Sequence, residues 1–205
     1  MSLTVNAGGS NNDFQPVSAG LHLARCYQII DLGHQTVPKY KAEGFSVMPK
    51  VRITWEICDE MMSDNRPFSI SKEYTASLGE QARLRKDLWA WRGRDFTDAE
   101  LKGFSLENVL GKPCQLLIDH TEKNGKTYAN INSIVPVKKT EVVPELVNPM
   151  VKFDIQEFDQ KIFDTLTSYV QKKILMSKEL EETGIPIVAT GREPEPEIED
   201  ESVPF

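Results

Sequence analysis

The segment 51–57 alternates strictly between apolar and polar residues, and this pattern restricts the fold more than any other feature of the chain. Its apolar members are Val51, Ile53, Trp55 and Ile57, and its polar members are Arg52, Thr54 and Glu56. A repeat of two residues places these two sets on opposite faces of a β-strand. The pattern is the clearest strand signal in the chain, so we expect a fold that contains a β-sheet.

Four more segments are typical of strands. Residues 21–30 are rich in apolar and β-branched residues, and residues 68–74 alternate again. The runs 113–120 and 126–134 flank Asn124-Gly125, a strong hairpin signal because both residues tolerate positive φ. Helix formers over 80–91 and a capping-box sequence at 97–100 stand between the third and fourth strands. This layout predicts a mainly β fold, a five-stranded OB-like barrel with helical insertions.

The chain divides into four predicted parts. Residues 1–19 form a mobile N-terminal segment, 20–140 the OB-like domain, 141–183 a linker with an amphipathic helix, and 184–205 an acidic tail. The helix is predicted over about 154–176, from apolar residues at helical spacing: Ile155, Phe158, Ile162, Leu166, Tyr169 or Val170, and Ile174. Such a stripe is normally buried, so we expect it to pack on the barrel or on a second subunit. A docking helix for another protein is the alternative.

The net charge of −7 is distributed unevenly. Residues 1–140 hold 18 Lys and Arg against 16 Asp and Glu, a balance of +2, while residues 141–205 hold 6 against 15, a balance of −9. The segment 184–205 has too little apolar surface to fold alone, which predicts a disordered tail. A mildly basic body with an acidic tail favours an interaction tail.

Catalytic motifs are missing from the sequence. It contains no P-loop, no dinucleotide-binding glycine pattern, no HExxH and no GxSxG, and its three histidines lie in separate segments. The cysteines Cys26, Cys58 and Cys114 lie in apolar runs and are expected to be reduced core residues. We therefore predict no catalytic residue, no metal and no cofactor. One enzymatic alternative stays open, a metal-dependent nuclease that uses Asp59, Glu60 and Asp119.

Targeting signals are also missing. No apolar run is long enough to span a membrane, and the start of the chain lacks the regions of a signal peptide. We expect a cytoplasmic protein without a membrane partner.

Aromatic residues lie among basic ones at several places. Binding of single-stranded nucleic acid without sequence preference needs cations that follow phosphates and flat side chains that stack on bases. The candidate DNA-binding residues are Lys39, Tyr40, Lys41, Lys50, Arg52, Lys72, Tyr74, Lys123, Lys126 and Tyr128. Phe45 joins them in the first long polar connection, residues 33–47. In contrast, Trp55, Trp89 and Trp91 fall on apolar faces and are expected in the core.

The last seven residues resemble the C-terminal tail of bacterial and phage single-stranded DNA-binding proteins, which is acidic and ends in a hydrophobic residue, proline and phenylalanine. The matching residues are Glu199, Asp200, Glu201, Val203, Pro204 and Phe205. The stretches 71–75, 84–94 and 103–114 are similar to the single-stranded DNA-binding replication proteins of tailed phages. The resemblance implies an OB-fold that coats single strands during replication or recombination, in the cytoplasm of a bacterial host.

The same resemblance implies the partners. These are single-stranded DNA and the replication or recombination proteins that the tail binds. A homo-oligomer is a separate expectation, which rests on the predicted helix over 154–176 if that helix packs on a second subunit. A protein-binding adaptor that never meets nucleic acid is the second alternative, beside the nuclease.

Overall fold

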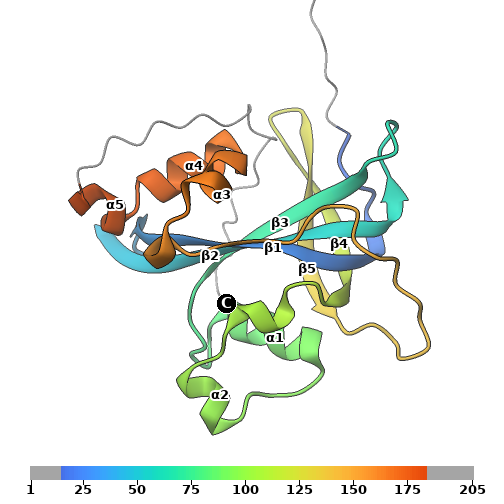
Figure 1. Cartoon of the computed structure of the whole chain (residues 1–205), viewed down its shortest axis with the longest axis horizontal. Coiled ribbons are helices and arrows are strands. Elements are labelled where there is room, and N and C mark those ends of the chain that lie inside the picture. Colours follow the sequence, from blue (N-terminus) through green and yellow to red (C-terminus); the bar gives the residue numbers. More distant parts are fainter. Residues whose placement is uncertain (1–14, 184–205) are drawn as a thin grey trace, which may run out of the picture.

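The computed structural model describes residues 15–183, so the predicted tail and most of the predicted N-terminal segment lie outside the described residues. The fold is mainly β, as predicted (Figure 1). Its strands are β1 (Gly20–Pro38), β2 (Phe45–Met61), β3 (Pro67–Thr75), β4 (Pro113–Lys123), β5 (Lys126–Val135) and β6 (Val151–Phe153). Its helices are α1 (Arg83–Arg92), α2 (Asp98–Lys102), α3 (Gln160–Thr165), α4 (Ser168–Leu175) and α5 (Lys178–Thr183), with short 3-10 turns η1 (Leu106–Val109) and η2 (Ile155–Glu157).

The strands form one sheet in the order β3-β2-β1-β4-β5. Neighbours on this path are antiparallel, and β6 joins the free part of the β1 edge in parallel, beyond the point where β4 separates from β1. The predicted insertion between the third and fourth strands is confirmed, since α1 and α2 lie there. The predicted hairpin is confirmed as well, with φ of 54° at Asn124 and 73° at Gly125.

The sheet is open. Within residues 15–183 no ladder of backbone hydrogen bonds joins β3 to β5, so the predicted barrel is not closed by strand pairing. Side chains bridge the gap instead, because α1 packs against both edge strands. Lys72 of β3 donates to the Ile131 carbonyl of β5 at 3.1 Å, and Arg83 of α1 donates to the Asn132 carbonyl at 2.5 Å.

The connection predicted over residues 33–47 is largely strand. β1 continues to Pro38 and β2 already begins at Phe45. The break that suggested a loop is a bulge between Asp31 and Gly33, where Gly33 has a φ of +69° and its N–H donates to the Asp31 carboxylate. Glycine adopts this left-handed conformation without steric cost, so the ladder resumes after one irregular residue. Residues 33–50 thus form a long hairpin, hereafter the β1–β2 arm.

The core lies on the inner face of the sheet, the face that carries Trp55. Trp55 is fully buried and its ring lies 5.7 Å from that of Trp91 on α1. Trp89, expected in the core, is instead 54% exposed, because a step of two helical residues turns it away from the inward stripe. Cys26 and Cys114 are buried free thiols, as predicted, whereas Cys58, also expected in the core, is a free thiol that is only half-buried. Burial raises the pKa of Cys26 to about 12.

The predicted helix over 154–176 is divided into shorter pieces. Thr167 accepts a hydrogen bond from the N–H of Val170 and starts a new helix, while Leu166 before it has extended backbone. The expected packing on the sheet is confirmed, since the apolar residues of this region cover Ile30 and Leu32 on the outer face of β1. The buried members of this second cluster are Phe153, Ile155, Phe163, Leu166, Val170 and Ile174. Figure 1 shows α3, α4 and α5 on one side of the sheet and α1 and α2 on the other.

The predicted linker is also held against the outer face. The buried Glu56 carboxylate accepts hydrogen bonds from the backbone N–H groups of Val147 and Asn148, at 2.9 and 2.8 Å. Arg25 donates to the carbonyls of Val143 and Pro144, at 3.1 Å each. Outward polar side chains of β1 and β2 therefore fix the path by which the chain reaches the C-terminal helices.

Candidate nucleic-acid interface

Two of the predicted DNA-binding residues are core residues. Tyr74 is only 3% exposed and its hydroxyl donates to Asp87 at 3.0 Å, while the Lys72 ammonium lies 3.3 Å from the same carboxylate. The expectation that they face outward is wrong, because positions 68, 70, 72 and 74 share one face of β3 and that face is buried. Lys72 and Tyr74 connect α1 to the sheet and are not part of the candidate interface.

The end of the β1–β2 arm exposes aromatic and basic side chains together. Tyr40 is 50% exposed and Phe45 is 68% exposed, and Lys39 and Lys41 are exposed beside them. The Lys41 ammonium lies over the Tyr40 ring, 5.1 Å from its centroid. An aromatic ring held by a neighbouring cation and open to solvent is suited to stacking on a base whose phosphate contacts that cation.

The β4–β5 hairpin carries the next group. Lys123 pairs with Lys126 and Thr121 pairs with Tyr128, and these two pairs are separated by one position on each strand. Lys123, Lys126 and Tyr128 therefore share one face of the hairpin, as their predicted grouping required. Both lysines are exposed and Tyr128 is half-buried.

The remaining predicted residues, Lys50 and Arg52, lie on the outer face of β2. Arg52 forms an ion pair with Glu73 of β3 at 3.2 Å, and Lys50 donates to Thr75 at 3.1 Å. The C-terminal helix α4 adds two side chains to this place. The Lys173 ammonium lies 2.7 Å from Glu73 and the Tyr169 hydroxyl donates to it at 3.3 Å. We call Arg52, Glu73, Tyr169 and Lys173 the outer cluster.

The outer cluster has a surplus of positive charge. Two cations share one carboxylate, and both cations also lie against the Tyr169 ring, at 5.5 Å for Arg52 and 4.7 Å for Lys173. The side chains of Arg52, Glu73 and Lys173 are 21%, 20% and 33% exposed, so the cluster is open to ligands yet partly shielded from water. Partial desolvation strengthens its field relative to a fully solvated surface.

Sequence reasoning missed Tyr169 and Lys173. In the sequence, Tyr169 is part of the apolar stripe, and Lys173 stands next to Ile174, which is buried. Their partner Glu73 lies 96 and 100 residues earlier, so no local pattern joins them. A tyrosine in an otherwise fully apolar stripe is the one available signal, since its hydroxyl needs a polar partner.

The arginines around α1 are engaged within the protein. Arg83 pairs with Asp87 at 2.8 Å, while Arg92 and Arg94 both pair with Glu100 of α2. Hydrogen bonds from Arg94 and from the Thr97 N–H lower the pKa of Glu100 to about 2. These contacts hold α2 beside α1, which makes the basic residues here structural.

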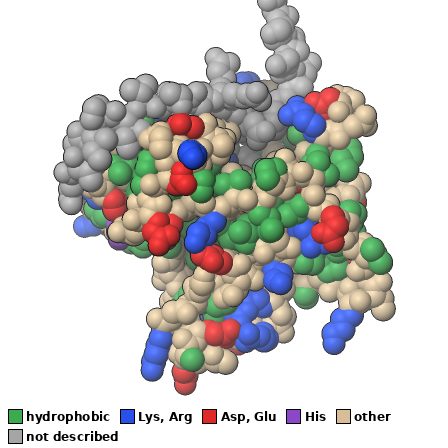
Figure 2. All heavy atoms as spheres, in the orientation of Figure 1, with side chains coloured by type: hydrophobic (Ala, Val, Ile, Leu, Met, Phe, Trp, Pro, Cys, Tyr) green, Lys and Arg blue, Asp and Glu red, His purple; other side chains and the backbone are tan. Residues whose placement is uncertain are grey.

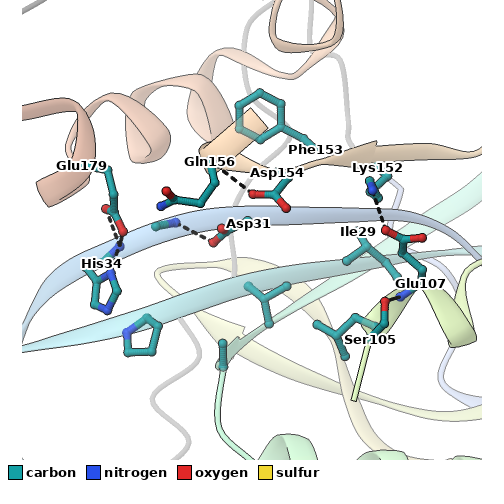
Figure 3. A pocket seen from close by; sticks show the side chains of 15 residues that line it. Ile29, Asp31, His34, Ser105, Glu107, Lys152, Phe153, Asp154, Gln156 and Glu179 are labelled. Carbon is teal, nitrogen blue, oxygen red and sulfur yellow. Dashed lines mark hydrogen bonds and ion pairs between the residues drawn. The ribbon is translucent and has the colours of Figure 1, made fainter. Parts of the chain in front are cut away.

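A separate cavity of about 310 Å³ lies at the base of the arm (Figure 3). In Figure 3, His34 contacts Glu179 on one side of it and Lys152 contacts Glu107 on the other. Burial, together with the nearby carboxylates of Asp154 and Glu179, raises the pKa of Asp31. Because its polar lining is dominated by acids, this cavity does not suit a phosphate.

The carboxylates of the nuclease alternative have partners within the protein. Asp59 accepts from the Leu23 N–H at 2.8 Å, Glu60 from the Ser18 hydroxyl at 2.6 Å, and Asp119 from the Asn132 amide. Among residues 15–183 no group of three or more His, Cys, Asp or Glu side chains is arranged to hold a metal ion.

No protein-family model matches the chain, and the curated proteins searched give no match either. In the described part of the chain, no helix is both long and apolar enough to cross a membrane.

On the face shown in Figure 2, basic side chains alternate with acidic ones and form no continuous positive patch. The candidate interface therefore rests on the local geometry of the arm, the β4–β5 hairpin and the outer cluster.

Proposed function

We propose that this protein binds and protects single-stranded DNA without sequence preference during phage DNA replication or recombination, and that its acidic tail recruits replication proteins. The observation that carries the proposal is the end of the β1–β2 arm. Tyr40 and Phe45 are exposed there beside Lys39 and Lys41. Exposed aromatic side chains reduce the solubility of a protein, so their exposure here points to a binding role. Their placement among lysines matches the base stacking and the phosphate contacts that single strands require.

The strand order supports an OB-like architecture for this function. In an OB-fold the second and third strands bind oligonucleotides together with the loops after strands one and four. The order β3-β2-β1-β4-β5, with α1 between the two edges, is the order that such a barrel has when opened along one seam. The arm, the outer cluster and the β4–β5 hairpin then correspond to the three parts of that binding surface.

The tail enters the proposal through its composition, since residues 199–205 lie outside the described residues. Glu199, Asp200 and Glu201 supply negative charge, and Val203, Pro204 and Phe205 supply apolar surface. A basic pocket with an apolar slot on a replication protein is the complementary partner.

Fluorescence anisotropy with a labelled oligo(dT) strand tests the proposal. Binding should be tight at low salt and should weaken steeply as salt rises, because lysine and arginine contacts release counterions. Oligo(dA) and mixed strands should bind with similar affinity, and a duplex of the same length should bind more weakly. Absence of binding to every single strand at low salt would overturn the proposal.

A further inference from the structure

The outer cluster is an anion site whose anion belongs to the protein. One oxygen of Glu73 accepts from Arg52 at 3.2 Å and from Tyr169 at 3.3 Å, and the other accepts from Lys173 at 2.7 Å. A guanidinium, an ammonium and a phenol hydroxyl around one carboxylate are also the donors that proteins direct at a phosphate group.

We propose that Glu73 is an internal counter-anion at a phosphate site, and that a phosphodiester of single-stranded DNA displaces it. This inference rests on the proposed function. The site is accessible, because the three charged side chains are 20–33% exposed. The Glu73 side chain itself reaches the surface, so it can turn toward solvent while Arg52 and Lys173 stay in place.

Displacement leaves α4 in the interface. In the free protein Glu73 links α4 to the sheet through Tyr169 and Lys173, and the apolar cluster around Ile174 holds the helix independently. A phosphate that replaces the carboxylate contacts the same three donors. The C-terminal helices, about 100 residues away in sequence, thereby become part of the DNA-binding surface.

The Glu73 carboxylate should lower the affinity of the protein for single-stranded DNA. It should also make that affinity less dependent on salt concentration. With Glu73 in place, the first phosphate meets two cations that are already half neutralised. Removing the carboxylate charge should tighten binding about three- to tenfold, as expected for the loss of a competing, partly exposed ion pair. One additional effective phosphate contact should also steepen the plot of log K against log salt by about one unit.

The test compares Glu73→Gln with wild type and with Glu107→Gln, by anisotropy with oligo(dT) over a range of salt. Glutamine keeps the length of Glu73 and an oxygen that accepts from Tyr169. Glu107 is a matched control, because it pairs with Lys152 away from the outer cluster and its substitution changes the net charge equally. Glu73→Gln should bind more tightly with a steeper salt slope, and Glu107→Gln should stay within about twofold of wild type.

A second comparison measures the effect of Lys173→Gln within each background, so that an effect of Glu73→Gln by itself cancels. Lys173→Gln should weaken binding more in the Glu73→Gln background than in wild type, because its charge is neutralised only when Glu73 is present. If wild type binds while Glu73→Gln binds equally or less tightly and the two Lys173 effects are equal, the internal anion is refuted and the proposed function stands. If neither wild type nor any variant binds at low salt, both are refuted.

Discussion

Replacing the two exposed aromatic residues of the arm should separate binding from folding. Tyr40 is 50% and Phe45 is 68% exposed, so each contributes little to the core. Alanine at either position should change the free energy of unfolding by no more than about 0.5 kcal/mol, the usual range for exposed sites. Each ring that stacks on a base is worth about 1–3 kcal/mol, so Tyr40→Ala or Phe45→Ala should raise the Kd for oligo(dT) about 5- to 150-fold.

The assay needs two readouts on the same variants. Anisotropy with oligo(dT) at fixed salt gives Kd, and urea denaturation gives the free energy of unfolding. Trp89→Ala on α1 is a matched control, since Trp89 is an equally exposed aromatic at 54% but lies outside the candidate interface. Unchanged affinity in Tyr40→Ala, in Phe45→Ala and in the double variant would refute the assignment of the arm. So would an equal loss of affinity in Trp89→Ala.

The other predictions concern the core, pH, the thiols and the tail. Asp87→Ala should destabilise the fold by about 3–5 kcal/mol in urea denaturation, because it leaves the buried Lys72 without its carboxylate. The pKa of Glu100 is lowered to about 2, so its contribution to stability should be complete above about pH 4.5 and lost as pH falls toward 2. Thermal melts of Glu100→Gln should lack that part of the pH dependence. Cys26, with a pKa raised to about 12, should resist a thiol reagent at pH 8 in the native protein and react in urea, whereas rapid native labelling would contradict its burial. Deleting residues 193–205 should leave affinity for oligo(dT) equal or higher, because their acids compete with phosphate for the same cations, and a large loss of affinity would contradict the tail assignment.

The sheet was predictable wherever the sequence repeats with a period of two or has a decisive turn. The alternation around Trp55 and the Asn124-Gly125 pair led to the correct inner face and the correct hairpin. The same alternation in β3 also indicated that Tyr74 is buried, and the DNA-binding prediction disregarded it in favour of the neighbouring lysine. The position of a residue in the alternation of its strand should therefore decide which face it is assigned to, ahead of the composition of its neighbours.

The remaining parts of the fold and of the candidate site depend on irregular local structure or on long-range contacts, so the sequence did not predict them. The sequence suggests a loop where the arm lies, because a single bulge at Gly33 interrupts the strand pattern. The strand β6 has only three residues, too few to show a repeat. Tyr169 and Lys173 reach Glu73 only after the C-terminal helices pack on Ile30 and Leu32. Such a site is created by tertiary packing, and no window of local sequence contains it.

Photo-crosslinking maps the claimed binding surface most directly. The protein is bound to a single-stranded oligonucleotide that carries iodouracil, irradiated, digested and analysed by mass spectrometry for peptides attached to DNA. Our account predicts attachment within residues 39–45 of the arm, at Tyr128 of the β4–β5 hairpin and at Tyr169 of the outer cluster, all abolished by excess unlabelled oligo(dT). Attachment confined to α1 and α2, or no attachment under conditions where anisotropy reports binding, would contradict it.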